Sequence, residues 1–337
     1  MKTYYTDLLI VGAGPAGCFL AKSVKDTDVI LIERSRLPRN KPHSGLLVEE
    51  SKDLLYPIGV PKDVFSTLSE LSLEHVDVDN NLNIVQKKAL GNTDHIKFDH
   101  WLTKLIGEDT NLMENTSVTK IEQLDTGVKA YVVKDGEEQA IIAKKLVGAD
   151  GITSTVRRLL GITPLKRYST LQNFVKTEKE IQNCQFIYWN DLTDWYSWVV
   201  PKDDGIVEVG GAFGLSTDKD IALGRLMRKM GIEGKIVSRK AWLLSKLSGI
   251  GDIYLGDGKN IFLIGEAAGL ISPSTGEGIS FGLRSGIVLS EALCSERPFY
   301  DYTKKIHPLV DELESKILKS NILSDPERRK RFLNSLK

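Results

Sequence analysis

The most constraining feature of the chain is a glycine-rich turn between a buried strand and a helix near the N-terminus. The turn Gly12-Ala13-Gly14-Pro15-Ala16-Gly17 matches the pattern G-x-G-x-x-G. It follows the apolar run TDLLIVG, and the next apolar run, DVILIER at residues 28–34, places Glu33 about 20 residues after the turn. Strand, helix and strand within roughly 30 residues predict a βαβ unit and therefore a parallel sheet.

The turn has the residues that a dinucleotide site requires. Gly12 permits the tight turn, Gly14 lets the backbone approach a pyrophosphate, and Gly17 lets the helix pack closely on the strand. The helix N-terminus then offers N–H groups and the positive end of its dipole to the phosphates. Glu33 is placed to accept hydrogen bonds from ribose hydroxyls. The sequence therefore predicts a bound dinucleotide.

The composition argues against several other classes of protein. Lys and Arg balance Asp and Glu at 45 each, so the net charge indicates no nucleic-acid partner. The three cysteines are far apart and the histidines lack metal-ligand spacing, so we expect neither a disulfide framework nor a metal site. No apolar run approaches the ~18–20 residues that span a bilayer. No signal-peptide pattern precedes the first strand, and we expect a cytoplasmic protein.

The order of the predicted elements indicates an α/β protein with interleaved domains. Residues 110–150 alternate between apolar and polar, and the turns DTG and DGEE divide them, which predicts an antiparallel meander. Further strands are expected within 184–213 and a helix at 221–231, before NIFLIG returns to a buried strand and the remainder becomes helical. We expect a Rossmann-like domain with a parallel sheet at 1–73, 92–160 and 256–295, an antiparallel-sheet substrate domain at 74–91 and 161–255, and C-terminal helices at 296–337.

Two later motifs favour FAD among the dinucleotides. LVGADGITSTVRRLLG places Asp150 and Gly151 at a strand end before a helix, and IFLIGEAAGLISPSTGEGISFGLRSG places Glu266 at another strand end. An NAD dehydrogenase needs neither motif. A flavin needs acceptors for its ribityl hydroxyls, and it needs N–H donors at its N1–C2=O edge once the ring is reduced. We therefore expect FAD as the cofactor.

Together these motifs give the chain a resemblance to a known group of enzymes. It resembles the flavoprotein superfamily of p-hydroxybenzoate hydroxylase-type monooxygenases and, within it, is most similar to the geranylgeranyl reductase family. The glycine turn with Glu33, GADG-x-x-S-x-V-R and GEAAG…P-x-TGEGI carry the resemblance. KPHSGLLVEES at 41–51 and WYSWVVPKDDGIVEVGGAF at 195–213 extend it over nearly the whole chain.

The resemblance implies FAD contacts from all of these segments. Small residues around Glu266 would let strand and helix crowd the flavin, and the turn at 275–278 would present backbone N–H groups to the N1–O2 edge of the ring. The expected cofactor-binding residues are Gly12, Gly14, Pro15, Ala16, Gly17, Glu33, Arg34, Lys41, Ser44, Gly45, Lys97, Val118, Asp150, Gly151, Gly265, Glu266, Thr275, Gly276, Glu277, Gly278 and Ile279.

Four positions within these segments depart from the family pattern. Glu266 stands where the family has Asp, so its reach to the ribityl chain differs by one methylene group. His43 and Ser44 replace the Cys and the following Gly of KPCGG, and Lys97 stands close to where an Arg is common. A role for the family's cysteine therefore does not transfer to His43.

The resemblance also implies a reaction, namely hydride transfer from flavin N5 to a carbon–carbon double bond of a hydrophobic, prenyl-like substrate. His43 is the candidate catalytic proton donor, and a histidine that only packs or binds the flavin is the alternative. Tyr188, Trp198 and Phe213 are candidates for the substrate pocket, with plain sheet core as the alternative for each. The chain has one dinucleotide fold, so we expect electrons from docked NAD(P)H or from a small redox protein.

The C-terminal tail SDPERRKRFLNSLK combines Arg328, Arg329, Lys330 and Arg331 with Phe332, Leu333 and Leu336. Such a basic amphipathic end can lie on an anionic membrane, and we weigh this peripheral contact against a solvated surface helix.

Two other functions stay open at this stage. One is an aromatic hydroxylase with the same cofactor. A flavin halogenase is a more distant alternative of the same kind. The other is a prenyl-binding escort that has lost its flavin. The segments STGEG and KPHSG favour the reductase over the hydroxylase, and the intact glycines argue against the escort.

Overall fold

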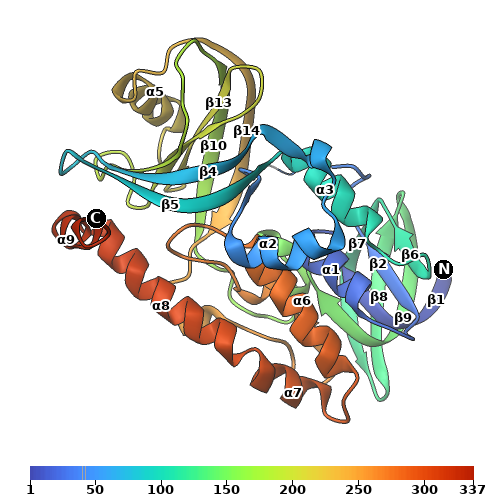
Figure 1. The fold of residues 1–337 in the computed structure, drawn as a ribbon. Helices are drawn as coiled ribbons and strands as arrows, with labels where there is room; N and C mark the ends of the chain where they lie inside the picture. Colours follow the sequence, from blue (N-terminus) through green and yellow to red (C-terminus); the bar gives the residue numbers. More distant parts are fainter. Residues whose placement is uncertain (40, 42) are drawn as a thin grey trace. The chain divides into compact units, whose positions relative to one another are not determined.

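The computed structural model describes residues 1–39, 41 and 43–337, and it divides into two compact units (Figure 1). The first unit comprises Met1–Arg39, Asp99–Lys166 and Leu247–Ser315. The second comprises Asn40–Phe98, Arg167–Lys246 and Lys316–Lys337. These boundaries differ from the three-part division expected from the sequence. Which unit holds the cofactor and which the substrate stays a prediction.

The first unit contains a mixed sheet in which parallel strands adjoin an antiparallel meander. The strand order is β6-β2-β1-β9-β8-β7, and β15 pairs with β9. The pairs among β6, β2, β1, β9 and β15 are parallel, whereas β7–β8 and β8–β9 are antiparallel. The βαβ unit and the meander expected from the sequence are both confirmed. The bounds are β1 (Lys2–Val11), β2 (Val29–Ile32), β6 (Thr110–Met113), β7 (Thr116–Leu124), β8 (Gly127–Lys134), β9 (Glu137–Gly148) and β15 (Ile261–Leu263).

Helices α1 (Pro15–Ser23) and α6 (Ile279–Leu293) pack closely in the first unit because α6 presents glycines to α1. A Cβ added to Gly282 would lie 3.4 Å from the Ala16 Cβ, and one added to Gly286 would lie 3.2 Å from the Ala16 carbonyl oxygen. The first unit also contains α4 (Thr155–Leu159), α7 (Pro298–Lys305) and the short 3-10 helices η3 (Gly151–Thr153), η4 (Ile250–Asp252) and η5 (Gly265–Ala268).

The second unit contains a largely antiparallel sheet with the order β14-β10-β13-β12-β11-β4-β5-β3. Only the β11–β4 pairing is parallel among the pairings of the described residues in this sheet. The strands expected within 184–213 and the helix expected at 221–231 are present. The strands are β3 (Leu46–Leu47), β4 (Phe65–Asp77), β5 (Leu82–Thr93), β10 (Arg167–Lys176), β11 (Cys184–Tyr188), β12 (Ser197–Pro201), β13 (Ile206–Phe213) and β14 (Lys235–Ser245). The helices are α2 (Glu49–Leu55), η1 (Tyr56–Ile58), η2 (Lys62–Val64), α5 (Lys219–Lys229) and α9 (Pro326–Asn334), while α3 (His95–Lys104) and α8 (His307–Ser324) cross the boundaries between units.

The two faces of this sheet differ because successive residues of a strand point to opposite sides. On one face, Val207 and Val209 of β13 pack with Leu223 and Leu226 of α5, which covers this face (Figure 1). The other face carries a set of buried rings that we call the aromatic cluster: Tyr168, Phe186, Tyr188, Trp195, Tyr196 and Trp198. The fold class expected from the sequence, with parallel and antiparallel sheets and C-terminal helices, is confirmed.

Arg329 anchors the C-terminal helix α9 to the second unit. Its side chain is 1% exposed, and Nη2 donates to Asp77 Oδ1 at 2.9 Å and to Asp79 Oδ2 at 2.6 Å. Nη1 donates to Asn190 Oδ1 at 3.0 Å and to the Leu323 carbonyl at 2.9 Å. This arrangement pairs one buried cation with two carboxylates from the β4–β5 turn region, so charge and hydrogen bonding are both largely satisfied.

The rest of the tail has a mixed environment. Leu333 is buried, whereas Arg328, Lys330 and Arg331 are exposed. Two members of the set considered for membrane contact, Arg329 and Leu333, are therefore used inside the second unit. No helix in the described parts of the chain combines the length and the apolar character needed to cross a membrane.

We predict that Arg329→Ala lowers the free energy of unfolding by about 3–5 kcal/mol, because it leaves the buried carboxylate of Asp77 without its cation. Urea unfolding followed by tryptophan fluorescence measures the change. Arg328→Ala is the matched control, since Arg328 is an exposed neighbour in the same helix, and its effect is expected to stay within about 0.5 kcal/mol. Equal stability of the two variants would contradict the anchor.

Candidate functional site

The glycine turn of the first unit requires glycine at two positions for the fold itself. Gly12 has φ +106°, and a Cβ there would lie 2.6 Å from the Ala149 carbonyl oxygen. A Cβ on Gly17 would lie 1.9 Å from the Gly12 carbonyl oxygen. Gly14 is different, because a Cβ there would meet only the Arg39 guanidinium, at 3.2 Å. The Gly14 surface of the turn therefore has room for an approaching ligand.

Glu33 lies at the end of β2 and faces this turn. It is 2% exposed and accepts from the Ala13 N–H at 3.1 Å and from the Ser35 N–H at 3.0 Å. It also forms an ion pair with Arg39, whose guanidinium donates to the Ala13 carbonyl at 3.3 Å. Arg39 brings positive charge to the turn, which suits an anionic pyrophosphate.

Arg39 was not among the cofactor-binding residues expected from the sequence. The sequence does contain a signal for it, since three arginines follow Glu33 in ERSRLPR. Of these three, only Arg34 was expected to bind the cofactor. Arg34 is exposed, and its Nη1 lies 3.4 Å from Thr153 Oγ1.

Asp150 organises the strand end that follows β9. Its carboxylate accepts from Ser154 Oγ at 2.6 Å and from the N–H groups of Thr155 at 2.6 Å and Val156 at 3.2 Å, so it caps the start of α4. Burial raises the pKa of the Asp150 carboxyl, and these hydrogen bonds oppose that rise. The next residue, Gly151, has φ +69°, which favours glycine.

A buried arginine joins this segment to the strand end that carries Glu266. Arg157 is 6% exposed, and it donates to the carbonyls of Ala267 at 3.2 Å, Asp252 at 2.8 Å and Thr163 at 3.0 Å. Glu266 itself lies partly buried in η5. The two acidic strand ends expected to contact a flavin are therefore neighbours in the first unit.

Gly265 connects the same corner to the glycine turn. Its φ is +55°, and a Cβ there would lie 3.0 Å from the Ala16 Cβ at the start of α1. Its N–H donates to Ser285 Oγ in α6 at 3.0 Å. The structure therefore brings together the three motifs that the sequence places at residues 12–17, 148–151 and 265–269.

The turn before α6 is held by its own side chains. Thr275 Oγ1 donates to Ser272 Oγ at 2.9 Å, and the Gly276 N–H, with φ +64° at that residue, donates to the Ser272 carbonyl at 2.8 Å. The Glu277 carboxylate accepts from the Ser280 N–H at 2.6 Å and from Ser280 Oγ at 2.8 Å. Gly278 and Ile279 then begin the helix. Glu277 thus serves as a cap of α6, and its contact with the flavin stays a prediction.

The remaining expected cofactor residues are divided between the units. Val118 is buried in β7 of the first unit, whereas Lys41, Ser44, Gly45 and Lys97 belong to the second. The Ser44 carbonyl accepts from the Lys202 ammonium at 2.6 Å, and exposed Lys97 donates to the Asp63 carbonyl at 3.1 Å. Pro42 of the KPHSG segment lies outside the described residues. The roles of this group toward FAD stay predictions.

His43 lies beside a second histidine in the second unit. Its Nδ1 accepts from the Gly45 N–H at 3.0 Å, which places the proton of the neutral ring on Nε2. The His43 and His95 ring centroids are 5.2 Å apart, and His95 Nε2 is 2.9 Å from the Lys240 ammonium. Burial lowers the pKa of the Lys240 ammonium. His43 is therefore one of three neighbouring nitrogen-bearing side chains rather than an isolated ring.

The three residues expected in a substrate pocket do not lie together. Tyr188 and Trp198 belong to the aromatic cluster, whereas Phe213 packs in the apolar cluster on the opposite face. The reason is strand register, since Trp198 pairs with Gly210 and Phe213 is therefore on the other side of β13. Whether Tyr188 and Trp198 contact a substrate stays a prediction.

Tyr188 is tied to a buried histidine. The Tyr188 hydroxyl lies 3.1 Å from His75 Nδ1, and Gln86 Oε1 lies 3.2 Å from His75 Nε2. His75 is 2% exposed, and burial lowers its pKa from 6.5 to about 4, with the Gln86 hydrogen bond opposing the shift.

We predict an acid-sensitive stability that depends on His75. Between pH 6.5 and about 4 the unfolded histidine binds a proton that the folded one does not, so stability is fully present above pH 6.5 and falls as the pH drops. Wild type should lose about 3 kcal/mol more than His75→Gln over this window in urea unfolding. His307→Gln, which changes an exposed histidine, should keep the wild-type pH dependence.

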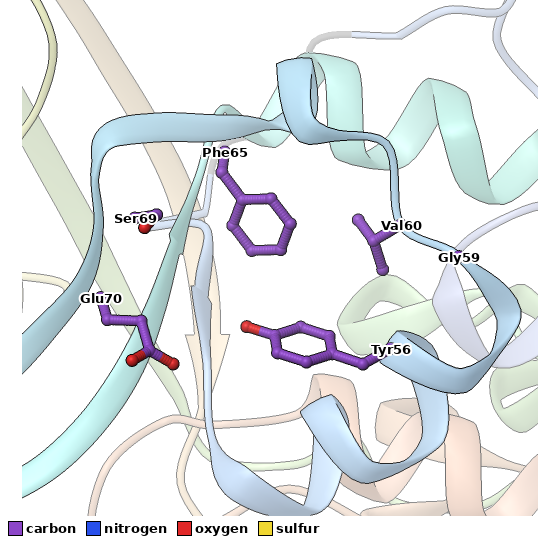
Figure 2. A pocket seen from close by; sticks show the side chains of 6 residues that line it. All are labelled: Tyr56, Gly59, Val60, Phe65, Ser69 and Glu70. Carbon is purple, nitrogen blue, oxygen red and sulfur yellow. The ribbon is translucent and has the colours of Figure 1, made fainter.

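A surface pocket of about 390 Å³ lies elsewhere in the second unit (Figure 2). The rings of Tyr56 and Phe65 meet edge to face at 5.8 Å, and the Glu70 carboxylate pairs with the Lys52 ammonium at 3.3 Å. The lining residues are Tyr56, Gly59, Val60, Phe65, Ser69 and Glu70. None of these six was expected from the sequence to bind FAD or substrate.

Comparison with known proteins identifies the family. A model of the FAD binding domain matches residues 5–213. The chain belongs to this family. It is also 32% identical over 343 residues to Protein CbrA of Shigella flexneri serotype 5b (strain 8401), covering 98% of this chain and 93% of the relative. Protein CbrA of Escherichia coli O9:H4 (strain HS) gives the same identity and coverage.

Solved structures share the fold at low sequence identity. A geranylgeranyl bacteriochlorophyll reductase-like protein from Thermoplasma acidophilum has a TM-score of 0.85 and 18% identity, covering 99% of this chain and 92% of that one. The p-nitrophenol 4-monooxygenase PnpA from Pseudomonas putida DLL-E4 has a TM-score of 0.77 and 17% identity, covering 100% and 94%. At these identities the likeness concerns the fold, which serves both reductase-like and hydroxylating flavoproteins.

The chain is thus an FAD-binding flavoprotein of an oxidoreductase and monooxygenase family, and FAD is its cofactor. The first unit's residues fit that group: Gly14 leaves open backbone beside a helix N-terminus, and Arg39 adds a cation there. Proteins of this class bind a small-molecule substrate and a reductant.

We predict that Gly14→Ala weakens FAD binding at least about tenfold, or ~1.4 kcal/mol, because its methyl group fills the surface that a pyrophosphate would approach. The apoprotein should keep its stability to within about 1 kcal/mol, since the methyl group meets only the flexible end of Arg39. FAD titration followed by flavin fluorescence measures the affinity. Gly17→Ala is the contrasting variant, and it should destabilise the apoprotein because its Cβ overlaps the Gly12 carbonyl.

Proposed function

We propose that the protein is an FAD-dependent reductase of the geranylgeranyl reductase type that reduces carbon–carbon double bonds of a hydrophobic, prenyl-like substrate. The aromatic face of the second unit's sheet carries this proposal. Phe186 and Tyr196 have ring centroids 5.1 Å apart, and Tyr196 and Trp198 are 5.7 Å apart. Such a continuous set of buried apolar and aromatic groups suits an alkene chain better than a charged metabolite. The fold shared with a geranylgeranyl reductase-like protein supports the same choice.

Each unit has a distinct task in this proposal. When bound, FAD would supply the hydride for the reduction. Gly12–Gly17 and Arg39 would hold its pyrophosphate, Glu33 would hold its ribose and Glu266 would hold its ribityl chain. In the second unit, Tyr188 and Trp198 border the substrate, and His43 holds the proton that the second carbon receives. The adjacent His95 and Lys240 can return a proton to His43, since the rings of His43 and His95 lie 5.2 Å apart and the Lys240 ammonium lies 2.9 Å from His95 Nε2.

The electrons come from NAD(P)H docked transiently or from a small redox protein. Peripheral membrane contact through the exposed cations Arg328, Lys330 and Arg331 would suit a prenyl substrate.

A second candidate is hydroxylation of an aromatic ring, because the fold is also that of p-nitrophenol 4-monooxygenase. The segments STGEG and KPHSG favour the reductase. The two functions differ in what reoxidises the reduced flavin, since a hydroxylase consumes oxygen when an aromatic substrate is present. A prenyl-binding escort without FAD is a third candidate, and FAD binding by this family argues against it.

The deciding experiment uses FAD-loaded protein reduced with dithionite under anaerobic conditions. We predict that geranylgeraniol reoxidises the flavin and yields a product heavier by two hydrogen atoms, measured by absorbance and mass spectrometry. His43→Gln should slow this reoxidation about 10²-fold while leaving reduction by dithionite unchanged. His307→Gln, which replaces an exposed histidine, is the control. Rapid oxygen consumption with NAD(P)H and p-nitrophenol, and no reaction with the prenyl alcohol, would instead establish the hydroxylase.

A further inference from the structure

Glu208 is an acid in the middle of an apolar strand. In IVEVGGAF it stands between Val207 and Val209, and it is 0% exposed. Those two valines pack in the cluster beneath α5, so Glu208 and Gly210 point to the opposite face, which carries the aromatic cluster. A carboxyl group placed there is desolvated, and this cost needs a compensating interaction.

The hydrogen bonds of Glu208 fall on one oxygen. Oε1 accepts from the Trp198 indole N–H at 2.7 Å and from Gln172 Nε2 at 3.1 Å. Oε2 is buried and has no hydrogen-bond partner in the described part of the chain. This division matches a neutral carboxylic acid, in which the carbonyl oxygen accepts two hydrogen bonds and the hydroxyl oxygen holds a proton that it has yet to donate.

The nearby cations are occupied by other groups. The Lys202 ammonium donates to the Ser44 carbonyl at 2.6 Å and to Asn92 Oδ1 at 2.8 Å, and the Lys240 ammonium contacts His95 at 2.9 Å. Within the residues that the structure describes, Glu208 forms no ion pair.

Burial is the dominant influence on the protonation of Glu208. It raises the pKa of the carboxyl group, against opposing effects of Lys202, the Trp198 hydrogen bond, His43 and Lys240. The buried thiol of Cys184 also faces this group, and burial keeps that thiol protonated by raising its pKa. The neutral form of Glu208 therefore follows from both its contacts and its surroundings.

Strand register and a glycine in β13 together hold the contacts of Glu208 in place. Trp198 and Gln172 are both directly opposite Gly210, on β12 and β10. A Cβ on Gly210 would lie 2.3 Å from Trp198 Cε2, so only glycine lets the indole lie over β13 with its N–H near Glu208. A buried acid, two donors aimed at one oxygen and a glycine that admits the indole form a built site on the aromatic face.

We propose that Glu208 is a neutral carboxylic acid whose Oε2–H donates a hydrogen bond to a neutral oxygen, an alcohol or carbonyl, at the polar end of an otherwise apolar substrate. This assignment rests on the proposed function, in which the substrate binds the aromatic face. It narrows the substrate class to oxygen-bearing prenyl compounds, and it separates them from pure hydrocarbons and from prenyl diphosphates, whose charge a neutral acid does not offset.

The first test reads the protonation state directly, without substrate or flavin. The infrared difference spectrum of wild type minus Glu208→Gln at neutral pH should contain a carboxylic acid C=O band. Glu178→Gln is the control, because Glu178 is an exposed acid of the same unit and should give no such band. Absence of the band in the Glu208→Gln difference would overturn the assignment.

The second test uses two prenyl probes with the same number of carbon atoms, farnesol, which carries a hydroxyl group, and the hydrocarbon farnesene, which carries none, with binding followed by tryptophan fluorescence. Wild type should bind farnesol about 5-fold to 10-fold more tightly than farnesene, as one net hydrogen bond allows. Farnesol, and not farnesene, should shift the carboxylic acid band. Glu208→Leu should lose the discrimination while still binding farnesene, and Glu208→Gln should keep part of it through its amide N–H.

Equal affinity of wild type for both probes, absence of binding by either probe, or unchanged discrimination in Glu208→Leu would overturn the proposal. The proposed reductase is tested independently by the reoxidation of reduced flavin. A hydroxyl-selective Glu208 with no alkene reduction would therefore retain the binding site and reject the reaction. Alkene reduction without a preference for farnesol would retain the proposed reaction and reject the proposed role of Glu208.

Discussion

The site depends on the close approach of backbone segments at the glycine turn. The Gly12 carbonyl occupies the space where a Gly17 side chain would begin, and Ala149 of the next motif occupies the corresponding space at Gly12. Gly265 and Gly286 bring η5 and α6 against Ala16, since an added Cβ would lie 3.0 Å from the Ala16 Cβ at Gly265 and 3.2 Å from the Ala16 carbonyl oxygen at Gly286. Protein interiors have little free volume to absorb an added carbon atom. Because glycines leave no side chains between these backbone segments, the strand ends that carry Glu33, Asp150 and Glu266 can lie near one another.

Much of the first unit follows from local patterns. The βαβ unit, the meander and the positions of the strand-end acids need only the spacing of glycines and apolar residues, which the sequence displays directly. The pairing of Glu33 with Arg39 did not follow, because it depends on the path of a loop that has no periodic pattern. The capping roles of Asp150 and Glu277 were also missed, since a side chain that caps a helix and one that contacts a ligand occupy the same sequence position.

The second unit is less predictable because its contacts are long-range. Phe213 and Trp198 lie on opposite faces, and only the register between β12 and β13 decides this. The tail was recognisable as a basic amphipathic helix, yet the partners of Arg329 lie about 250 residues earlier in the chain, at Asp77 and Asp79. Glu208 had a local signal, an acid between valines in a strand, and its importance emerges once Trp198 and Gln172 are seen to share one of its oxygens.

The Arg329 anchor also bears on how the protein is made. The second unit is assembled from residues 40–98, 167–246 and 316–337, and the last of these supplies the cation for Asp77. During synthesis this unit is completed only after residues 316–337 have left the ribosome, so Asp77 and Asp79 lack their cation until then. A chain that stops before Arg329 would therefore keep the glycine turn of its first unit and lack the cation that completes its second unit. Such a product is a natural client for chaperones and proteases.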